Sequence, residues 1–248
     1  MIQLHNEDCY ETLSKLQDRS VDMILQDPPY GVTQNDWDNI PDLEKMWEQW
    51  LRVIKPNGAI VFTAQQPFTS ELIMSNRKHF RYDLVWYKLG KSTGFLNANK
   101  MPLRSHEHII IFYKELPTYN PQKVKGRPNH SKGSHSRGNK QTNNNYGTFD
   151  QTFQSPPSDD KFPLSVVEFA SVHPPIHPTQ KPVDLMRWLI KTYTNEGERI
   201  FDGYSGSGTT ALACIKEKRS FIGSEMKKEY YDMAHKLIDE AQMQYSFF

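Results

Sequence analysis

The sequence predicts a doubly wound α/β fold, with a mostly parallel sheet of seven strands covered by helices on both faces. Short apolar runs bounded by turn residues alternate with stretches that have the apolar spacing of helices. A glycine-rich turn lies between one of the last of these runs and the helix that follows. The chain has 248 residues, 37% of them hydrophobic, which is enough for one large α/β domain or for one domain that carries a substantial insertion.

Seven apolar runs are the expected strands, at residues 2–4, 21–26, 59–63, 84–87, 109–113, 199–201 and 220–223. Helical spacing predicts six helices, at residues 10–17, 41–54, 66–77, 182–194, 209–218 and 227–243. Because strand and helix alternate along the chain, the strands are expected to lie mainly parallel.

Residues 114–175 interrupt this alternation and are rich in Asn, Ser, Gly and Pro, which predicts an inserted and partly mobile region. The whole chain has a formal charge of only +1, but residues 114–140 hold seven basic side chains against one acid, Glu115. The segment is therefore expected to contact nucleic-acid phosphates, a solvated loop being the alternative. The candidate residues are Lys123, Lys125, Arg127, Lys132, Arg137 and Lys140.

Only two cysteines are present, Cys9 and Cys214, and they are far apart in the sequence. This spacing argues against a disulfide framework or a zinc site, so no metal is expected and both are predicted to be small packing residues. The start of the chain resembles no signal peptide, and no apolar run is long enough to span a bilayer. We therefore expect a cytoplasmic protein without a membrane partner.

The glycine-rich turn covers residues 203–208, between the strand that ends near Asp202 and the helix that begins at Thr209. Glycines let a ligand approach the backbone, and the helix N-terminus offers unpaired N–H groups. Glu225 closes the following strand, at a distance suited to binding ribose hydroxyls. A nucleoside-containing cofactor is predicted, the alternative being a tight turn without any ligand.

Asp8, Asp27, Asp202 and Glu225 each follow or end an expected strand. Ligands of open α/β sheets bind at the carboxyl edge of the strands, so these acids are expected to meet there. Asp8 also has the spacing of a helix cap with Glu11, so a cap, a ligand contact, or both remain open. Since the glycine turn comes late in the chain, the predicted fold is circularly rearranged.

Asp27-Pro28-Pro29-Tyr30 follows the buried strand pattern at residues 21–26. Two prolines remove N–H donors, which leaves a rim of carbonyl and carboxylate acceptors beside the aromatic ring of Tyr30. Such a rim suits the amino group of a flat base that has been flipped out of its stack. An ordinary proline turn is the alternative. Trp37 lies in the polar loop that follows, where it either closes over the base or packs on the domain.

Together, residues 27–30, 177–182 (His-Pro-Thr-Gln-Lys-Pro) and 201–210 (Phe-Asp-Gly-Tyr-Ser-Gly-Ser-Gly-Thr-Thr), in this order, resemble the beta group of DNA amino-methyltransferases. The resemblance covers roughly 1–113 and 176–243, and it implies a Rossmann-like methyltransferase sheet. It implies that residues 1–113 form the catalytic half, 114–175 a target-recognition region and 176–248 the cofactor half. S-adenosylmethionine and double-stranded DNA are the implied ligands, and a homodimer is an open expectation because members of the group often dimerise.

The resemblance implies that Asp27 and the Pro28 carbonyl hold the target amino group beside Pro29, and that Tyr30 stacks on the base. It implies a cofactor site formed by Asp8, Cys9, Thr179, Lys181, Asp202, Gly203, Tyr204, Ser205, Gly206, Gly208, Thr209 and Glu225. Within that set, Asp202 and the turn would lie near the methionine part, Asp8 near the adenine ring, and Thr179 with Lys181 by the carboxylate. Tyr204 departs from the family's usual Phe, and His177 is expected to be structural.

The group contains adenine-N6 and cytosine-N4 enzymes, and Asp rather than Ser at position 27 favours adenine. Enzymes that methylate RNA adenine or protein glutamine generally carry the two motifs in the opposite order. Cytosine-C5 chemistry is excluded because it needs a nucleophilic cysteine, and neither Cys9 nor Cys214 follows a proline. A DNA-binding protein that senses the cofactor without catalysis is the remaining alternative.

Overall fold

The computed structural model describes residues 1–33, 35–36, 38–127, 140–143, 147–150, 159–175 and 179–245. The chain forms two compact units: residues 1–120 with 164–248 make up unit 1, and residues 121–163 make up unit 2. Trp37, Lys132, Arg137 and His177 lie outside the described residues. None of the helices in the described ranges is both long and apolar enough to cross a membrane.

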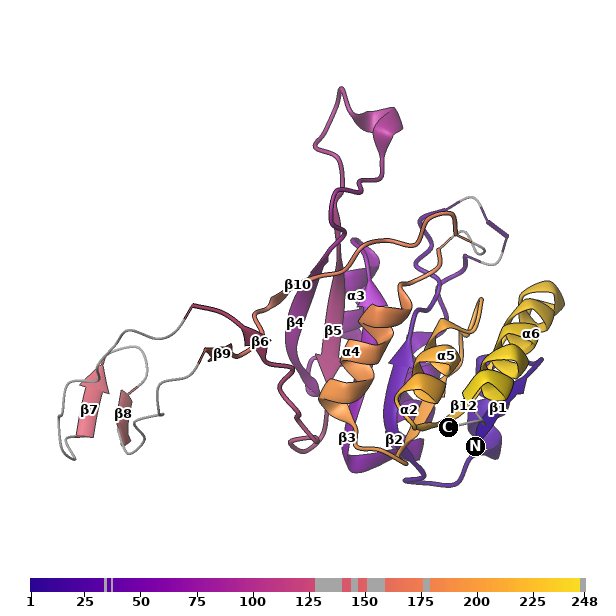
Figure 1. Ribbon diagram of the computed structural model, residues 1–248, viewed down its shortest axis with the longest axis horizontal. Helices are drawn as coiled ribbons and strands as arrows, with labels where there is room; N and C mark the ends of the chain where they lie inside the picture. Colours follow the sequence, from indigo (N-terminus) through magenta and orange to yellow (C-terminus); the bar gives the residue numbers. More distant parts are fainter. Residues whose placement is uncertain are drawn as a thin grey trace. The chain divides into compact units, whose positions relative to one another are not determined.

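Unit 1 is built on one eight-stranded sheet with the order β1-β12-β11-β2-β3-β5-β4-β10 (Figure 1). Every pair is parallel except the two that involve β5, which runs antiparallel to β3 and to β4. This arrangement confirms the predicted doubly wound, mostly parallel fold. The strands are β1 (Ile2–His5), β2 (Val21–Gln26), β3 (Ile54–Ala64), β4 (Phe80–Tyr87), β5 (His106–Phe112), β10 (Val166–Glu168), β11 (Arg199–Asp202) and β12 (Ser220–Ser224).

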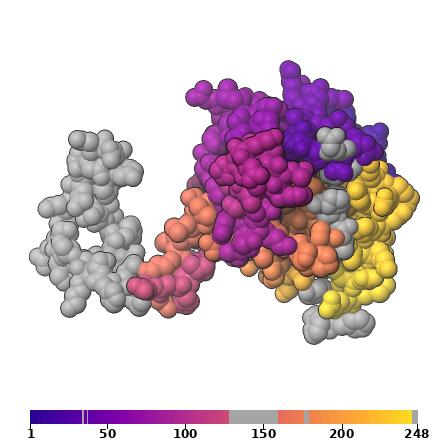
Figure 2. Space-filling view, turned by 90° about the horizontal axis from the view of Figure 1, so that it is seen from above, coloured from indigo at the N-terminus to yellow at the C-terminus, as the bar shows by residue number. Residues whose placement is uncertain are grey.

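The pairing of β1 with β12 joins the first strand of the chain to the last. Accordingly, Figure 2 shows the indigo N-terminal segments and the yellow C-terminal segments side by side. In the sheet, the strands around the glycine-rich turn are therefore followed by the first strand of the chain. The predicted circular rearrangement requires this order.

Helices cover both faces of the sheet, three on each (Figure 1). One layer consists of α1 (Cys9–Lys15), α2 (Leu43–Val53) and α3 (Phe68–Ser75). The other consists of α4 (Val183–Tyr193), α5 (Thr209–Lys216) and α6 (Lys228–Tyr245), and the short 3-10 helix η1 (Phe95–Asn97) lies between β4 and β5.

The central strands are buried on both faces, and alternate residues enter two different cores. In β2, Ile24 packs in the core under α1, α2 and α3, whereas Met23 and Leu25 pack in the core under α4, α5 and α6. Because both faces are covered, these strands are continuous apolar runs, which is why the sequence predicts them well.

The main differences from the sequence-based expectation are in β3, β4 and β10. β3 begins at Ile54 rather than residue 59, because Lys55, Pro56 and Asn57 are partly or fully exposed and interrupt its apolar run. β4 begins at Phe80 rather than residue 84, because exposed Arg81 and Asp83 alternate with partly buried Phe80 and Tyr82 and so break the apolar run. β10 adds an eighth strand, parallel to β4 at the sheet edge, from a stretch that the sequence analysis assigned to the insertion. Its three residues are too few to form a recognisable pattern.

The described residues of unit 2 form two small antiparallel pairs, β6 (Val124–Lys125) with β9 (Asp160–Lys161) and β7 (Lys140–Asn143) with β8 (Gly147–Asp150). Lys125 forms exposed ion pairs with Asp159 at 2.9 Å and Asp160 at 2.7 Å. These two acids lie beyond the basic segment counted in the sequence and offset part of its charge.

Candidate active site

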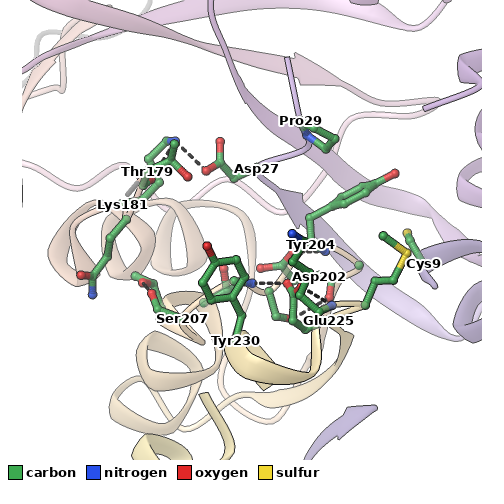
Figure 3. Close-up of a pocket in the computed structure, with 18 of the residues that line it drawn as sticks. Cys9, Asp27, Pro29, Thr179, Lys181, Asp202, Tyr204, Ser207, Glu225 and Tyr230 are labelled. Carbon is green, nitrogen blue, oxygen red and sulfur yellow. Dashed lines mark hydrogen bonds and ion pairs between the residues drawn. The ribbon is translucent and has the colours of Figure 1, made fainter. Parts of the chain in front are cut away.

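The four acids predicted at strand ends line one cavity of about 370 Å³ in unit 1. β1, β2, β11 and β12 are parallel, so their carboxyl ends meet at one sheet edge and bring Asp8, Asp27, Asp202 and Glu225 together. Figure 3 shows Asp27 facing Lys181, with Asp202 and Glu225 in another part of the same cavity. Asp8 also accepts a hydrogen bond from the Tyr10 amide and caps α1, so this side chain both caps a helix and lines the cavity.

The glycine turn places backbone N–H groups beside Glu225. The Gly206 amide donates to Glu225 Oε2 at 2.9 Å, and the Lys227 amide donates to Glu225 Oε1 at 2.8 Å. Gly208 precedes α5 with φ +79°, a conformation that side chains rarely adopt. The turn and the end of β12 are thereby held together around the carboxylate.

Gly203 is required by a close approach of the buried Cys9 side chain. A Cβ atom at position 203 would lie 2.0 Å from Cys9 Sγ and 3.1 Å from Gln26 Nε2. Both cysteines are buried and free, as expected for packing residues.

Asp202 is fully enclosed at the end of β11. Burial raises its pKa to about 7, although the Thr210 hydroxyl and the Tyr204 amide, which donates to Oδ1 at 3.0 Å, oppose this shift. Burial also raises the pKa of Glu225. A buried acid that titrates near neutrality is typical of a binding or catalytic site.

Every residue predicted for the cofactor lines this cavity except Gly208, which instead shapes the start of α5. The residues present fit an adenosine-containing cation: carboxylates stand at the strand ends, backbone N–H groups at the turn, and the cavity has the size of a small-ligand site. The cavity is also lined by residues that were not predicted as site residues: Asp36, Asn39, Ile40, Pro41, Gln180, Met186, Ser207, Thr210, Met226, Lys227 and Tyr230.

The Asp27 carboxylate is held by three side chains. Its Oδ1 accepts hydrogen bonds from the Tyr30 hydroxyl and the Thr63 hydroxyl, both at 2.5 Å. Its Oδ2 accepts from Lys181 Nζ at 2.6 Å. Position and orientation of the carboxylate are therefore set before any ligand binds.

A second cavity of about 440 Å³ adjoins the first and is lined by the whole Asp27–Tyr30 motif. The two cavities share Asp27, Pro29, Thr179, Gln180 and Lys181. One face of the Tyr30 ring stacks on Phe68, with 5.5 Å between centroids and 19° between planes. The second cavity therefore combines acceptors with an anchored aromatic ring, as a site for a flat base requires.

Lys181 is buried on the wall between the cavities and contacts two carboxylates. Its Nζ lies 2.6 Å from Asp27 Oδ2 and 3.5 Å from Glu107 Oε2, while Glu107 Oε1 accepts from Lys88 Nζ at 2.5 Å. Burial alone would lower the pKa of Lys181, but Asp27 and Glu107 outweigh burial and raise it. Burial would likewise raise the pKa of Glu107, but Lys181 and Lys88 lower it. Lys181 and Glu107 are therefore both charged at neutral pH.

Asp38, which the sequence analysis did not single out, organises the loop after the motif. Its Oδ1 accepts from the amides of Tyr30 and Gly31, and its Oδ2 from those of Val32 and Thr33, at 2.6 to 2.9 Å. Burial works to raise the pKa of Asp38, but hydrogen bonds from Thr33, Gly31 and Val32 lower it. One buried carboxylate thus fixes the chain path from the Asp27–Tyr30 motif toward the first cavity.

Thr63 and Glu107 also belong to the site, although the sequence motifs did not predict them. Thr63 lies near the carboxyl end of β3, next to β2, so the rule applied to the acids would have found it. Glu107 lies at the amino end of β5, and it reaches the same sheet edge only because β5 is antiparallel. In the sequence, Glu107 could have been noticed only as a single acid within an apolar strand.

Comparison with known proteins shows which family the chain belongs to. The model of the family described as DNA methylase matches residues 21–236. The chain is 28% identical to the type II methyltransferase M.HpaI of Haemophilus parainfluenzae, over 92% of this chain and 71% of that protein. It is 27% identical to the DNA adenine methyltransferase YhdJ of Escherichia coli, over 94% of this chain and 81% of that protein.

Among solved structures, the M1.HpyAVI-SAM complex matches with a TM-score of 0.64 and 25% identity, covering 96% of this chain and all of that one. The chain belongs to the DNA methylase family. This membership confirms the family, fold and enzyme class predicted from the motifs, and the expected cofactor is the one named in the matched complex.

Proposed function

We propose that this protein transfers a methyl group from S-adenosylmethionine to the exocyclic N6 of an adenine flipped out of double-stranded DNA. The observation that carries the proposal is the position of Asp27 on the shared wall of the two cavities. One cavity suits the cofactor and the other the base, so both would meet at this carboxylate.

When bound, S-adenosylmethionine supplies an electrophilic methyl group on a sulfonium. Adenine N6 is a weak nucleophile because its lone pair is delocalised into the ring. We assign the Asp27 carboxylate and the Pro28 carbonyl to hold its two N–H bonds, so that the nitrogen becomes more tetrahedral and is aligned for attack. Tyr30 would stack on the base while its hydroxyl keeps Asp27 in place.

Adenine is favoured over cytosine by the acid at position 27 and by the similarity to a protein named as a DNA adenine methyltransferase. Cytosine-N4 methylation remains the second candidate, because its target is also an aromatic amine and the same acceptors would hold it.

We further assign the catalytic half to residues 1–113, the cofactor half to 176–248 and target recognition to 114–175. Exposed Lys123, Lys125 and Arg127 support phosphate contacts by unit 2. A protein with this activity would act in the cytoplasm, at the nucleoid. Whether it works as a monomer or as a homodimer would be decided by its molecular mass in solution.

The proposal is tested by incubating the purified protein with mixed-sequence duplex DNA and S-adenosylmethionine that carries a labelled methyl group. After digestion to nucleosides, label in N6-methyldeoxyadenosine is expected, and sequencing of the modified DNA then gives the methylated site. Label in N4-methyldeoxycytidine would overturn the choice of base, and unlabelled DNA would contradict the proposal as a whole.

A further inference from the structure

Four charged side chains form a row that starts at the Asp27–Tyr30 motif and continues along the lining of the second cavity: Asp27, Lys181, Glu107 and Lys88. The signs alternate, and adjacent members lie 2.6, 3.5 and 2.5 Å apart. The side chains of Lys181 and Glu107 are only 5% and 10% exposed. The proposed roles of Asp27 and the cofactor residues leave the inner part of this row without a function.

The two carboxylates in the row are bound unequally. Asp27 accepts three side-chain hydrogen bonds, two at Oδ1 and one at Oδ2. By contrast, Glu107 Oε2 is buried and accepts no hydrogen bond from the described residues. Its distance of 3.5 Å from Lys181 Nζ is long for a charge-assisted hydrogen bond.

The target amino group must compete for Asp27. Since Oδ1 already accepts two hydrogen bonds, an N–H of the base would have to share Oδ2 with Lys181. A neutral amino group competes poorly with a buried ammonium. Productive binding is therefore favoured by a second acceptor for Lys181 close by, which weakens the hold of Lys181 on Oδ2.

We infer that Glu107 is this acceptor, a positioning residue that takes over the Lys181 ammonium when the target amino group binds Asp27. A shift of Lys181 Nζ by less than about 1 Å would turn the 3.5 Å contact into a charge-assisted hydrogen bond. Lys88 holds the other oxygen of Glu107 and keeps the carboxylate facing Lys181. The inference rests on the proposed role of Asp27.

Glu107→Gln tests the inference because it keeps the shape of the side chain but removes its charge. On a duplex with the site that the parent protein methylates, kcat is expected to fall at least tenfold, while the Kd for the cofactor stays within twofold. The matched control is Glu217→Gln, which removes a carboxylate from the distant ion pair with Arg187 and should act like the parent.

A second measurement separates this role from a structural one. Two duplexes, with adenine or unsubstituted purine at the target position, are bound in the presence of S-adenosylhomocysteine. Purine lacks the amino group, so Glu107→Gln should bind the purine duplex as the parent does and the adenine duplex at least fivefold more weakly. Equal weakening of both duplexes, or of neither, would overturn the inference.

A double variant asks whether Glu107 acts through Lys181. In a Lys181→Met background, adding Glu107→Gln should change kcat by less than twofold, because there is no longer a Lys181 ammonium that could shift from Asp27 to Glu107. A further tenfold loss would contradict the inference. If Glu107→Gln does not fold, Glu107→Asp serves instead, since its shorter side chain retracts the carboxylate. Failure of the proposed function would appear earlier, as a parent protein that leaves DNA unmethylated.

Discussion

Lys181 and Asp27 are 154 residues apart in the sequence, yet Lys181 Nζ lies 2.6 Å from Asp27 Oδ2 on the wall between the two cavities. The sequence analysis placed Lys181 near the cofactor carboxylate and Asp27 at the base. The ion pair therefore connects the 177–182 motif, just before α4, directly to the Asp27–Tyr30 motif after β2.

The first prediction concerns Asp27 itself. Asp27→Ala should lower methyl transfer about 100-fold or more, the scale for losing one preorganised polar contact at a reacting centre. Cofactor affinity, measured by calorimetry, should change far less. Asp18→Ala is the control, because this acid is exposed and forms an ion pair with Arg52, outside both cavities. Unchanged turnover in Asp27→Ala would reject its assigned role.

The second prediction concerns pH. The pKa of Asp202 is raised to about 7, so this acid is mostly protonated at pH 6 and mostly ionised at pH 8. The methionine part of the cofactor carries an ammonium group that an ionised Asp202 would bind. Cofactor affinity should therefore rise about tenfold between pH 6 and pH 8. Calorimetry across this range checks it, and Asp202→Asn should remove the dependence; the same rise in the variant would contradict it.

The third prediction concerns the loop held by Asp38. Asp38→Asn replaces one accepting oxygen by an amide group that cannot accept, which strands two backbone amides and should lower the free energy of unfolding by about 2 kcal/mol. Asp42→Asn is the matched control, since Asn caps a helix as well as Asp does. Chemical denaturation measures both variants, and equal stability of the two would rule out the proposed role of the Asp38 carboxylate.

The third prediction extends to acid pH, where the Asp38 carboxylate becomes protonated. Its pKa is lower in the folded protein than in the unfolded chain, so its contribution to stability is present above the unfolded pKa and is lost as pH falls through the folded pKa. Asp38→Asn should therefore lose less stability than the parent on acidification. A parallel loss in both proteins would show that Asp38 does not contribute to acid unfolding.

The fourth prediction concerns unit 2. Replacing Lys123, Lys125 and Arg127 by Gln should weaken DNA binding and flatten its salt dependence, by about 0.9 in log–log slope for each lost phosphate contact. Replacing Asp159 and Asp160 by Asn should have the opposite effect, because these acids pair with Lys125. Binding titrations at several salt concentrations check both, and an unchanged slope in the triple variant would reject the phosphate contacts.

Local sequence patterns were sufficient to predict much of the fold and part of the candidate site. β2 and β11 are buried on both faces and so form apolar runs, and Asp27 and Asp202 follow from where those runs end. Glu107 could not be placed this way, since its position depends on the antiparallel direction of β5, which only long-range pairing determines. Asp38 acts through backbone amides, which leave no side-chain pattern in the sequence.

The two cavities share five wall residues, and this thin partition has a consequence for inhibitor design. A single compound that joins an adenosine portion to an adenine through the position of the transferred methyl would occupy both cavities at once. Such a compound would gain from tethering, since binding of one end raises the effective concentration of the other. It would also discriminate against proteins that bind the same cofactor but place their acceptor base elsewhere.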